Sequence, residues 1–128
     1  MKKIVLLFSH QLTPKQEQDI YHSLNVEKKY TLPPALQSIW SQVPTDQELC
    51  LNSYLKEIQS FLEQHLSKGD YVLVQGDFGA TYSMIQFAKQ KGFKPIYSVN
   101  PRVAKEYIEN GIVKKYSEFE HKFFREYV

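Results

Sequence analysis

The segment GDYVLVQGDFGATYSMIQFAKQKG, residues 69–92, contains the pattern that decides the fold. Tyr71–Val74 is a short apolar run of β-branched and aromatic residues, typical of a strand that is buried on both faces. Gly76 and Gly79 follow, and then comes a run with apolar residues at helical spacing, which Gly92 ends. A strand, a glycine loop and a helix in this order point backbone N–H groups at an anion, so we expect a functional site at this loop.

The glycine loop leaves two interpretations open. It lacks the third glycine of a dinucleotide fingerprint and the Lys-Ser/Thr of a Walker A motif, so its glycines could serve only the packing of a tight turn. Asp77 would repel a phosphate group. We therefore expect Asp77 to cap the following helix, to bind a hydroxyl group or to orient a base.

The size and charge of the chain exclude several classes of protein. Its 128 residues are near the usual size of one domain, and we expect a single domain over residues 1–128. A net charge of +2 excludes a strongly basic coat for large nucleic acids, and no segment has the roughly 20 apolar residues of a membrane span. The single cysteine, Cys50, cannot form an internal disulfide, which indicates a reducing cytoplasmic location. We expect Cys50 to be a half-buried structural thiol within a helix.

Further strands and helices follow from the same patterns. The apolar run at residues 3–8 is too short for the core of a signal peptide and predicts a central strand. Residues 29–32 and 94–99 predict two more strands. Capping boxes at Thr13–Gln16 and Thr45–Glu48 predict helix starts, and the second should open the longest helix of the chain. This order of elements predicts an α/β fold with an open, mostly parallel sheet and helices on both faces.

The C-terminal part predicts a β-hairpin. Asn110-Gly111 is the strongest two-residue turn signal, and it joins the segments Val103–Glu109 and Ile112–Tyr127. Residues 104–106 also favour a helix, so a helix before the turn remains an alternative.

Polar residues follow three of the predicted strands. They are Ser9-His10-Gln11, residues 75–82, and residues 98–102. Ligands of parallel sheets bind outside the carboxyl ends of the strands, where the strand order reverses, so we expect the three segments to share one rim. No His, Cys, Asp or Glu residues have the spacing of metal ligands, and we expect neither a metal nor another cofactor.

Three segments resemble the small stand-alone CRISPR-associated ring nucleases of type III systems, which are related to CARF (CRISPR-associated Rossmann fold) domains. They are LLFSHQLT at residues 6–13, GDYVLVQGDFGATY at 69–82 and HKFFREY at 121–127. The resemblance covers the full length, and QGDFGATY is its most specific part. It implies a Rossmann-like homodimer that binds cyclic oligoadenylate, above all the four-membered ring, across its two-fold axis. It also implies that the protein cuts this ring without a metal and so ends an antiviral signal.

The implied chemistry assigns roles to the residues of the rim. Metal-free cleavage requires attack of a 2′-oxygen on the neighbouring phosphorus, which leaves a 2′,3′-cyclic phosphate. His10 is the candidate general base or acid, because imidazole titrates near neutral pH. Ser9 could bind a phosphate oxygen, and Asp77 could orient His10 or hold a ribose hydroxyl. The other candidates for ligand contact are Gln11, Gln75, Gly76, Phe78, Gly79, Ala80, Thr81, Tyr82, Ser98, Asn100 and Arg102.

Among these candidates, Phe78 or Tyr82 could stack on bases. Backbone N–H groups at the starts of the Thr13 and Ala80 helices could bind phosphates, assisted by Arg102. Each role has a structural alternative: a loop histidine, a helix cap, a core aromatic residue or a solvated arginine.

Two alternative functions also remain open. The protein could be a sensor that binds or sequesters the cyclic ligand without cutting it. It could instead be a Rossmann-like domain for a mononucleotide or a sugar phosphate. His121 and Arg125 lie on the predicted final strand with no assigned role, whereas His22 and His65 should lie at the surface of helices.

Overall fold

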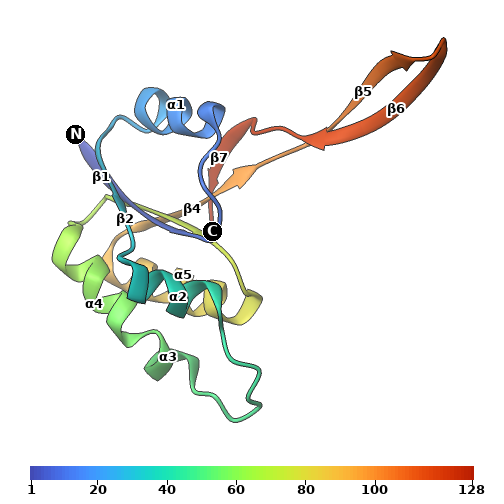
Figure 1. Cartoon of the computed structure of the whole chain (residues 1–128). Helices are drawn as coiled ribbons and strands as arrows, with labels where there is room; N and C mark the ends of the chain where they lie inside the picture. Colours follow the sequence, from blue (N-terminus) through green and yellow to red (C-terminus); the bar gives the residue numbers. More distant parts are fainter.

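A five-stranded sheet forms the centre of the computed structural model, which describes residues 1–128 (Figure 1). The strands lie in the order β2-β1-β3-β4-β7. The first four are parallel, and β7 runs antiparallel to β4. The prediction of an α/β fold with a mostly parallel sheet is thus confirmed. The strand bounds are β1 Lys2–Phe8, β2 Val26–Thr31, β3 Tyr71–Gln75, β4 Lys94–Val99 and β7 Phe123–Glu126.

Helices cover both faces of this sheet, as expected, but unequally. Helix α1 lies alone on one face, and the other helices lie on the opposite face (Figure 1). Alternate residues of β1 point to the two sides, so that Leu7 joins the larger core and Ile4 the smaller one. Full burial of such a side chain stabilises the fold by roughly 1.5–3 kcal/mol. The helix bounds are α1 Pro14–Ser23, α2 Pro34–Ser41, α3 Leu51–Tyr54, α4 Lys56–His65 and α5 Phe78–Lys91.

One predicted helix start is confirmed and the other is wrong. Thr13 and Gln16 form both hydrogen bonds of a capping box at the start of α1. Thr45–Glu48 opens no helix. The Leu49 N–H donates a hydrogen bond to the Asp46 carbonyl and closes a turn there. The next helix, α3, begins only at residue 51.

The expected long helix is divided, and α5, with 14 residues, is the longest. The apolar stripe that packs against the sheet, with Leu55, Ile58 and Leu62, continues across the division. Cys50 precedes α3 and is exposed, so the expectation of a half-buried thiol inside a helix is also wrong.

The predicted hairpin forms, but it is shorter than expected and stands apart from the sheet. Strands β5 (Arg102–Glu109) and β6 (Ile112–Phe119) pair antiparallel and project from the rest of the molecule (Figure 1). Asn110 and Gly111 have φ angles of 53° and 75°, the left-handed geometry of a type I′ turn, which excludes the helical alternative. The chain then leaves the hairpin, and β7 extends the main sheet beside β4.

A hydrogen bond from Tyr127 fastens the C-terminal end to the sheet. Its hydroxyl donates to the Val74 carbonyl at 2.7 Å. Burial, together with the neighbouring Tyr97, raises the pKa of the Tyr127 phenol above its ordinary value of 10.0. The folded state therefore favours the protonated phenol, and this contribution to stability is complete below pH 10 and is lost as the pH rises through the raised pKa.

Replacement of Tyr127 by phenylalanine tests this bond. Tyr127→Phe should lower the free energy of unfolding by about 1 kcal/mol at pH 7, because one hydrogen bond is lost. The difference from wild type should shrink as the pH rises above 10. Urea unfolding between pH 7 and 11 measures both effects, with Tyr21→Phe on the exposed side of α1 as the control. A difference that does not change with pH would contradict the assigned role of the phenol.

Candidate functional site

An open hollow of about 470 Å³ lies at the carboxyl ends of β1 and β2. The strand order reverses beside β1, because the chain passes from β2 on one side of β1 to β3 on the other, and open α/β sheets bind ligands at such a reversal. The hollow includes the loop after β1, which borders this reversal, but no residue of β3 or of the loop after β3 lines it. The polar residues of its lining are Ser9, His10, Gln11, Glu17, Lys29, Thr31, Gln37 and Ser41, and its apolar part is Leu6, Phe8 and Leu12.

Hydrogen bonds from α2 hold one wall of this hollow. Gln37 Nε2 donates to the Phe8 carbonyl at 3.0 Å and to Ser41 Oγ at 2.9 Å. Ser41 Oγ lies 3.2 Å from Ser9 Oγ. On the opposite side, Lys29 forms an ion pair with Glu17. The hollow therefore presents hydroxyl and amide groups and one cation that Glu17 pairs, which suits a polar ligand.

His10 is exposed at the edge of the hollow. Its ring lies edge-on to Phe8, with 5.6 Å between the ring centroids, and no group of the chain hydrogen-bonds its nitrogens. Asp77 does not orient this ring, because Asp77 Oδ2 accepts a hydrogen bond from the Ala80 N–H at 3.0 Å and caps α5. Of the roles that the sequence left open for Asp77, helix capping is confirmed. His10 is thus free to contact a ligand, but nothing in the chain fixes its tautomer.

The glycines of the loop permit close packing. A Cβ atom on Gly76 would lie 2.9 Å from Trp40 Nε1, and one on Gly79 would lie 2.8 Å from Leu51 Cδ1. Neither residue has a positive φ angle. The packing interpretation of these glycines therefore has a direct physical cause. Trp40 packs against Gly76, and the next residue, Ser41, lines the hollow.

The start of α5 exposes two aromatic side chains. Phe78 is 94% exposed and Tyr82 is 66% exposed, and their spacing of four places both on one side of the helix. Ala80, in contrast, is buried. Thr81 Oγ1 is buried without a hydrogen-bond partner. Phe78 and Tyr82 therefore form a surface on which flat rings can stack.

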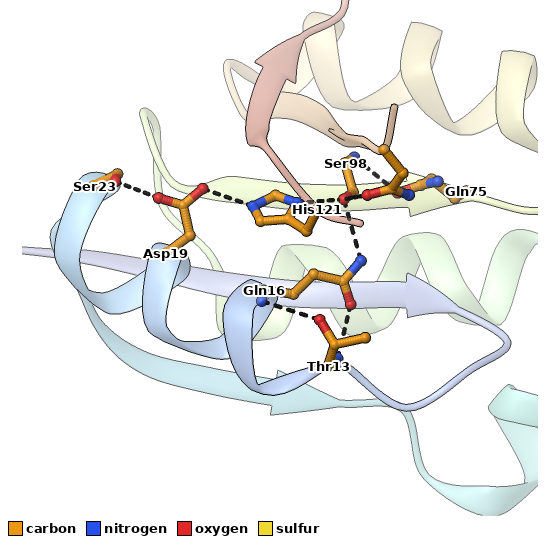
Figure 2. A network of polar contacts seen from close by, with 8 residues as sticks. Thr13, Gln16, Asp19, Ser23, Gln75, Ser98 and His121 are labelled. Carbon is orange, nitrogen blue, oxygen red and sulfur yellow. Dashed lines mark hydrogen bonds and ion pairs between the residues drawn. The ribbon is translucent and has the colours of Figure 1, made fainter. Parts of the chain in front are cut away.

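A buried polar network lies at the end of β4 (Figure 2). Ser98 is 5% exposed, and its hydroxyl accepts a hydrogen bond from Gln16 Nε2 at 3.1 Å and lies 2.5 Å from both Asn100 Oδ1 and His121 Nδ1. His121 Nε2 lies 2.7 Å from Asp19 Oδ2. The Ser98 N–H also donates to the side chain of Gln75 at 2.8 Å. The network thus joins α1, β3, β4 and the segment before β7.

Ser98, His121 and Asp19 are residue types of a catalytic triad, but their arrangement is structural. The serine is buried and its hydroxyl already has three partners. None of the three residues lines the hollow beside His10. They fix the position of α1, whose first turn adjoins that hollow.

The structure thus separates the predicted site residues into groups. Ser9, His10 and Gln11 lie together in the hollow, whereas Gln75, Ser98 and Asn100 hold the interior network. Arg102 begins the hairpin, where its guanidinium lies 5.1 Å from the ring centroid of Phe119. The predicted contact between Ser98 and a ligand stays a prediction, and the burial of Ser98 within the network does not support it.

Sequence reasoning missed most of the wall of the hollow. Lys29 and Thr31 end a strand whose polar residues were given no role, and the side chains from the neighbouring helices had no motif to mark them. The role of His121 was missed as well, although it opens one of the three segments that carry the resemblance.

The helix N-termini also offer fewer free N–H groups than expected. The Gln16 N–H is bonded to Thr13 Oγ1 at 3.2 Å, and the Ala80 N–H is bonded to Asp77. Nowhere in the chain do three His, Cys, Asp or Glu side chains gather as metal ligands would. None of the helices has the length and apolar content to cross a membrane.

The model of the Uncharacterized protein MJ1673 family matches residues 2–125. The chain belongs to this family. A curated relative, "Uncharacterized protein MJ1673" from Methanocaldococcus jannaschii, is 46% identical over 127 residues, which cover 99% of this chain and 98% of the relative. No solved structure matches the chain significantly. The matched residues include the sheet, the hollow and the hairpin.

Substitution of His121 tests the buried network. His121→Ala should lower the free energy of unfolding by about 1–3 kcal/mol, because Ser98 and Asp19 lose a buried partner. His22→Ala, an exposed histidine on the same helix as Asp19, should change it by less than about 0.5 kcal/mol. Denaturant unfolding measures both variants. Equal stability of His121→Ala and wild type would show that the network contributes nothing to the fold.

Proposed function

We propose that this protein is a cytoplasmic ring nuclease, which binds cyclic oligoadenylate and cuts it without a metal. The expected substrate is cyclic tetra-adenylate, and the expected role is to end the second-messenger signal of a type III CRISPR system in antiviral defence. The observation that carries the proposal is the position of Ser9 and His10. Both lie in a hollow beside the reversal of strand order, within one of the segments that resemble ring nucleases of the CARF type.

The size of the hollow supports a symmetric ligand shared by two chains. A volume of about 470 Å³ is within the range of small-molecule sites, roughly 300–1,000 Å³, and suits one part of a ring rather than all four nucleotides. A two-fold homodimer would supply every side chain twice, which matches a ring that is itself symmetric. We therefore propose that two Rossmann-like domains face each other across the ligand. The reversal of strand order between β1 and β3 supports this fold assignment.

The proposed reaction needs one group that moves a proton. His10 accepts the proton of a ribose 2′-hydroxyl, the 2′-oxygen forms a bond to phosphorus, and the bond from phosphorus to the 5′-oxygen breaks. The proton is returned to that 5′-oxygen, so the products are linear chains ending in a 2′,3′-cyclic phosphate. Ser9, Gln11 and Lys29 line the same hollow and supply donors for the negative charge on the phosphorane. Phe78 and Tyr82 offer stacking surfaces for bases.

A sensor that binds the ring without cutting it is the second candidate. One observation favours it: no carboxylate or other group of the chain orients the His10 ring. General bases in enzymes are usually oriented by a third group. The two candidates require the same hollow and differ only in whether the ring is opened.

Replacement of His10 separates these candidates. His10→Ala should slow single-turnover cleavage of cyclic tetra-adenylate by about 100-fold or more, with the dissociation constant of the ring changed by less than about threefold. The assay contains EDTA and an excess of protein, and chromatography separates the ring from linear products. His22→Ala, outside the hollow, should cleave at the wild-type rate.

The possible results of this assay are distinct. An unchanged rate in His10→Ala removes His10 as the proton acceptor. A ring that wild-type protein binds but leaves intact for many hours establishes the sensor. Tight binding of a single adenosine monophosphate by a monomer, without binding of the ring, would identify a mononucleotide protein.

The stacking role of the exposed aromatic residues is tested by binding. Tyr82→Ala should raise the dissociation constant of cyclic tetra-adenylate by about 5- to 150-fold, which corresponds to roughly 1–3 kcal/mol for one stacked base. Phe78→Ala should have a similar effect. Tyr21→Ala removes an exposed tyrosine from α1 and should leave binding unchanged. Calorimetry at one fixed salt concentration compares the three variants. Wild-type affinity in both α5 variants would exclude Phe78 and Tyr82 as stacking surfaces for the bases.

A further inference from the structure

The β5–β6 hairpin carries half of the large apolar side chains that the chain exposes. Among large apolar side chains, six in the hairpin are 44–75% exposed: Tyr107, Ile108, Ile112, Val113, Tyr116 and Phe119. They occur on both faces of the hairpin. Ile108 opposes Val113 on one face, and Tyr107 contacts Tyr116 on the other, with 5.7 Å between ring centroids. Soluble chains keep such surface small unless it forms an interface.

The hairpin also lacks support from the body of the protein. No helix or other strand packs extensively on β5 or β6, which contact each other far more than anything else. An isolated two-stranded hairpin is at best marginally stable in water. The ion pair between Lys105 and Glu120, at 2.9 Å, fixes only the base of the hairpin. A hairpin of this length would gain stability from a partner that packs on it.

The charges of the hairpin indicate what kind of partner fits. In each strand the basic residues precede the acidic ones, with Arg102 and Lys105 before Glu106 and Glu109 in β5, and Lys114 and Lys115 before Glu118 in β6. Glu106 opposes Lys115 directly, so the two strands bring both signs together. A nucleic-acid or anionic membrane surface would call for a predominantly basic arm. A mixed, nearly balanced pattern is self-complementary, because two identical surfaces related by a two-fold axis present both signs to each other.

The direction of the hairpin adds a second argument. It follows β4 through Asn100 and Pro101, so it leaves the molecule from the rim where the carboxyl ends of the parallel strands lie (Figure 1). Eight residues of β-strand extend about 26 Å. This length is close to twice the radius of gyration expected for a domain of this size. An arm that starts at this rim and has this length can lie along a second body that faces the same rim.

We propose that the β5–β6 hairpin is an arm that packs against a second copy of this chain and holds the two rims face to face. This proposal rests on the proposed function only for the orientation of the two copies, in which their rims face each other. With both faces of the arm covered in the dimer, its apolar side chains would remove roughly 600 Å² of surface from water on each copy, and about 1,200 Å² in the pair, the lower limit for a stable interface. The dimer therefore completes the site, because each hollow meets its counterpart only while both arms are engaged.

A paired substitution removes the apolar tip and keeps the hairpin. Ile108→Lys together with Val113→Glu replaces one cross-strand pair by an oppositely charged pair, which preserves strand pairing. Wild type should sediment at about twice the 15.1 kDa mass of one chain, and the double variant should dimerise at least 100-fold more weakly. Tyr107→Glu, opposite Lys114, is a second variant that acts on the other face. Circular dichroism and the free energy of unfolding show that each variant folds.

A matched control keeps the hairpin intact and removes an exposed charged pair elsewhere. Glu63→Gln with Lys91→Gln removes the ion pair between the C-terminal ends of α4 and α5, away from the arm, and should change the dimer dissociation constant by less than about threefold. Wild-type protein that is monomeric at 100 µM would overturn the proposal, whether or not the arm then binds vesicles or another protein. Folded variants of both kinds that dimerise like wild type would overturn it as well.

The outcomes for the arm and for the proposed function can be told apart. If wild type is a dimer, the variants are monomers, and cyclic tetra-adenylate binds to neither, then the arm stands and the ring nuclease proposal fails. If wild type cleaves the ring while the variants remain dimeric, the arm proposal fails and the ring nuclease stands. The two arm variants could also lose the dimer and ring binding together, while the control keeps the dimer and ring binding. That result supports the arm proposal and the ring nuclease proposal.

Discussion

The parallel pairing of β1 with a strand on each side is the constraint on which the rest of the structure depends. β1 is buried on both faces and pairs β2 along one edge and β3 along the other. Both connections must return the chain to the same end of the sheet, so the carboxyl ends of β1, β2 and β3 meet at one rim. The reversal of direction beside β1 leaves room outside the strand ends, and the polar residues after Phe8 occupy that place.

The polar network around Ser98 solves a second problem of this sheet. Only α1 covers the smaller core, so this side depends on a single helix. His121 and Gln16 connect that helix to the ends of β4 and β7 through buried hydrogen bonds. Unpaired polar groups in such a place would destabilise the fold, but a complete network gives α1 one fixed position. The first turn of α1 and the hollow beside it are therefore held by contacts that lie some distance from the hollow.

Local signals in the sequence identify most of the fold but little of the hollow. The glycine loop, the capping box at Thr13 and the Asn110-Gly111 turn each depend on neighbouring residues alone, and all three form as predicted. The capping box at Thr45 fails because a turn forms there and the apolar stripe begins later. Lys29 and Ser41 reach the hollow only through tertiary packing, which no spacing along the chain reveals.

Trp40 gives the protein a built-in optical reporter. It is the single tryptophan of the chain and is almost completely buried. Its Nε1 lies 3.3 Å from the Gln75 carbonyl, and its ring lies against Gly76, while the next residue of α2 lines the hollow. Its fluorescence therefore comes from one known position between the glycine loop and the hollow, and changes in emission can follow events at this rim without any added dye.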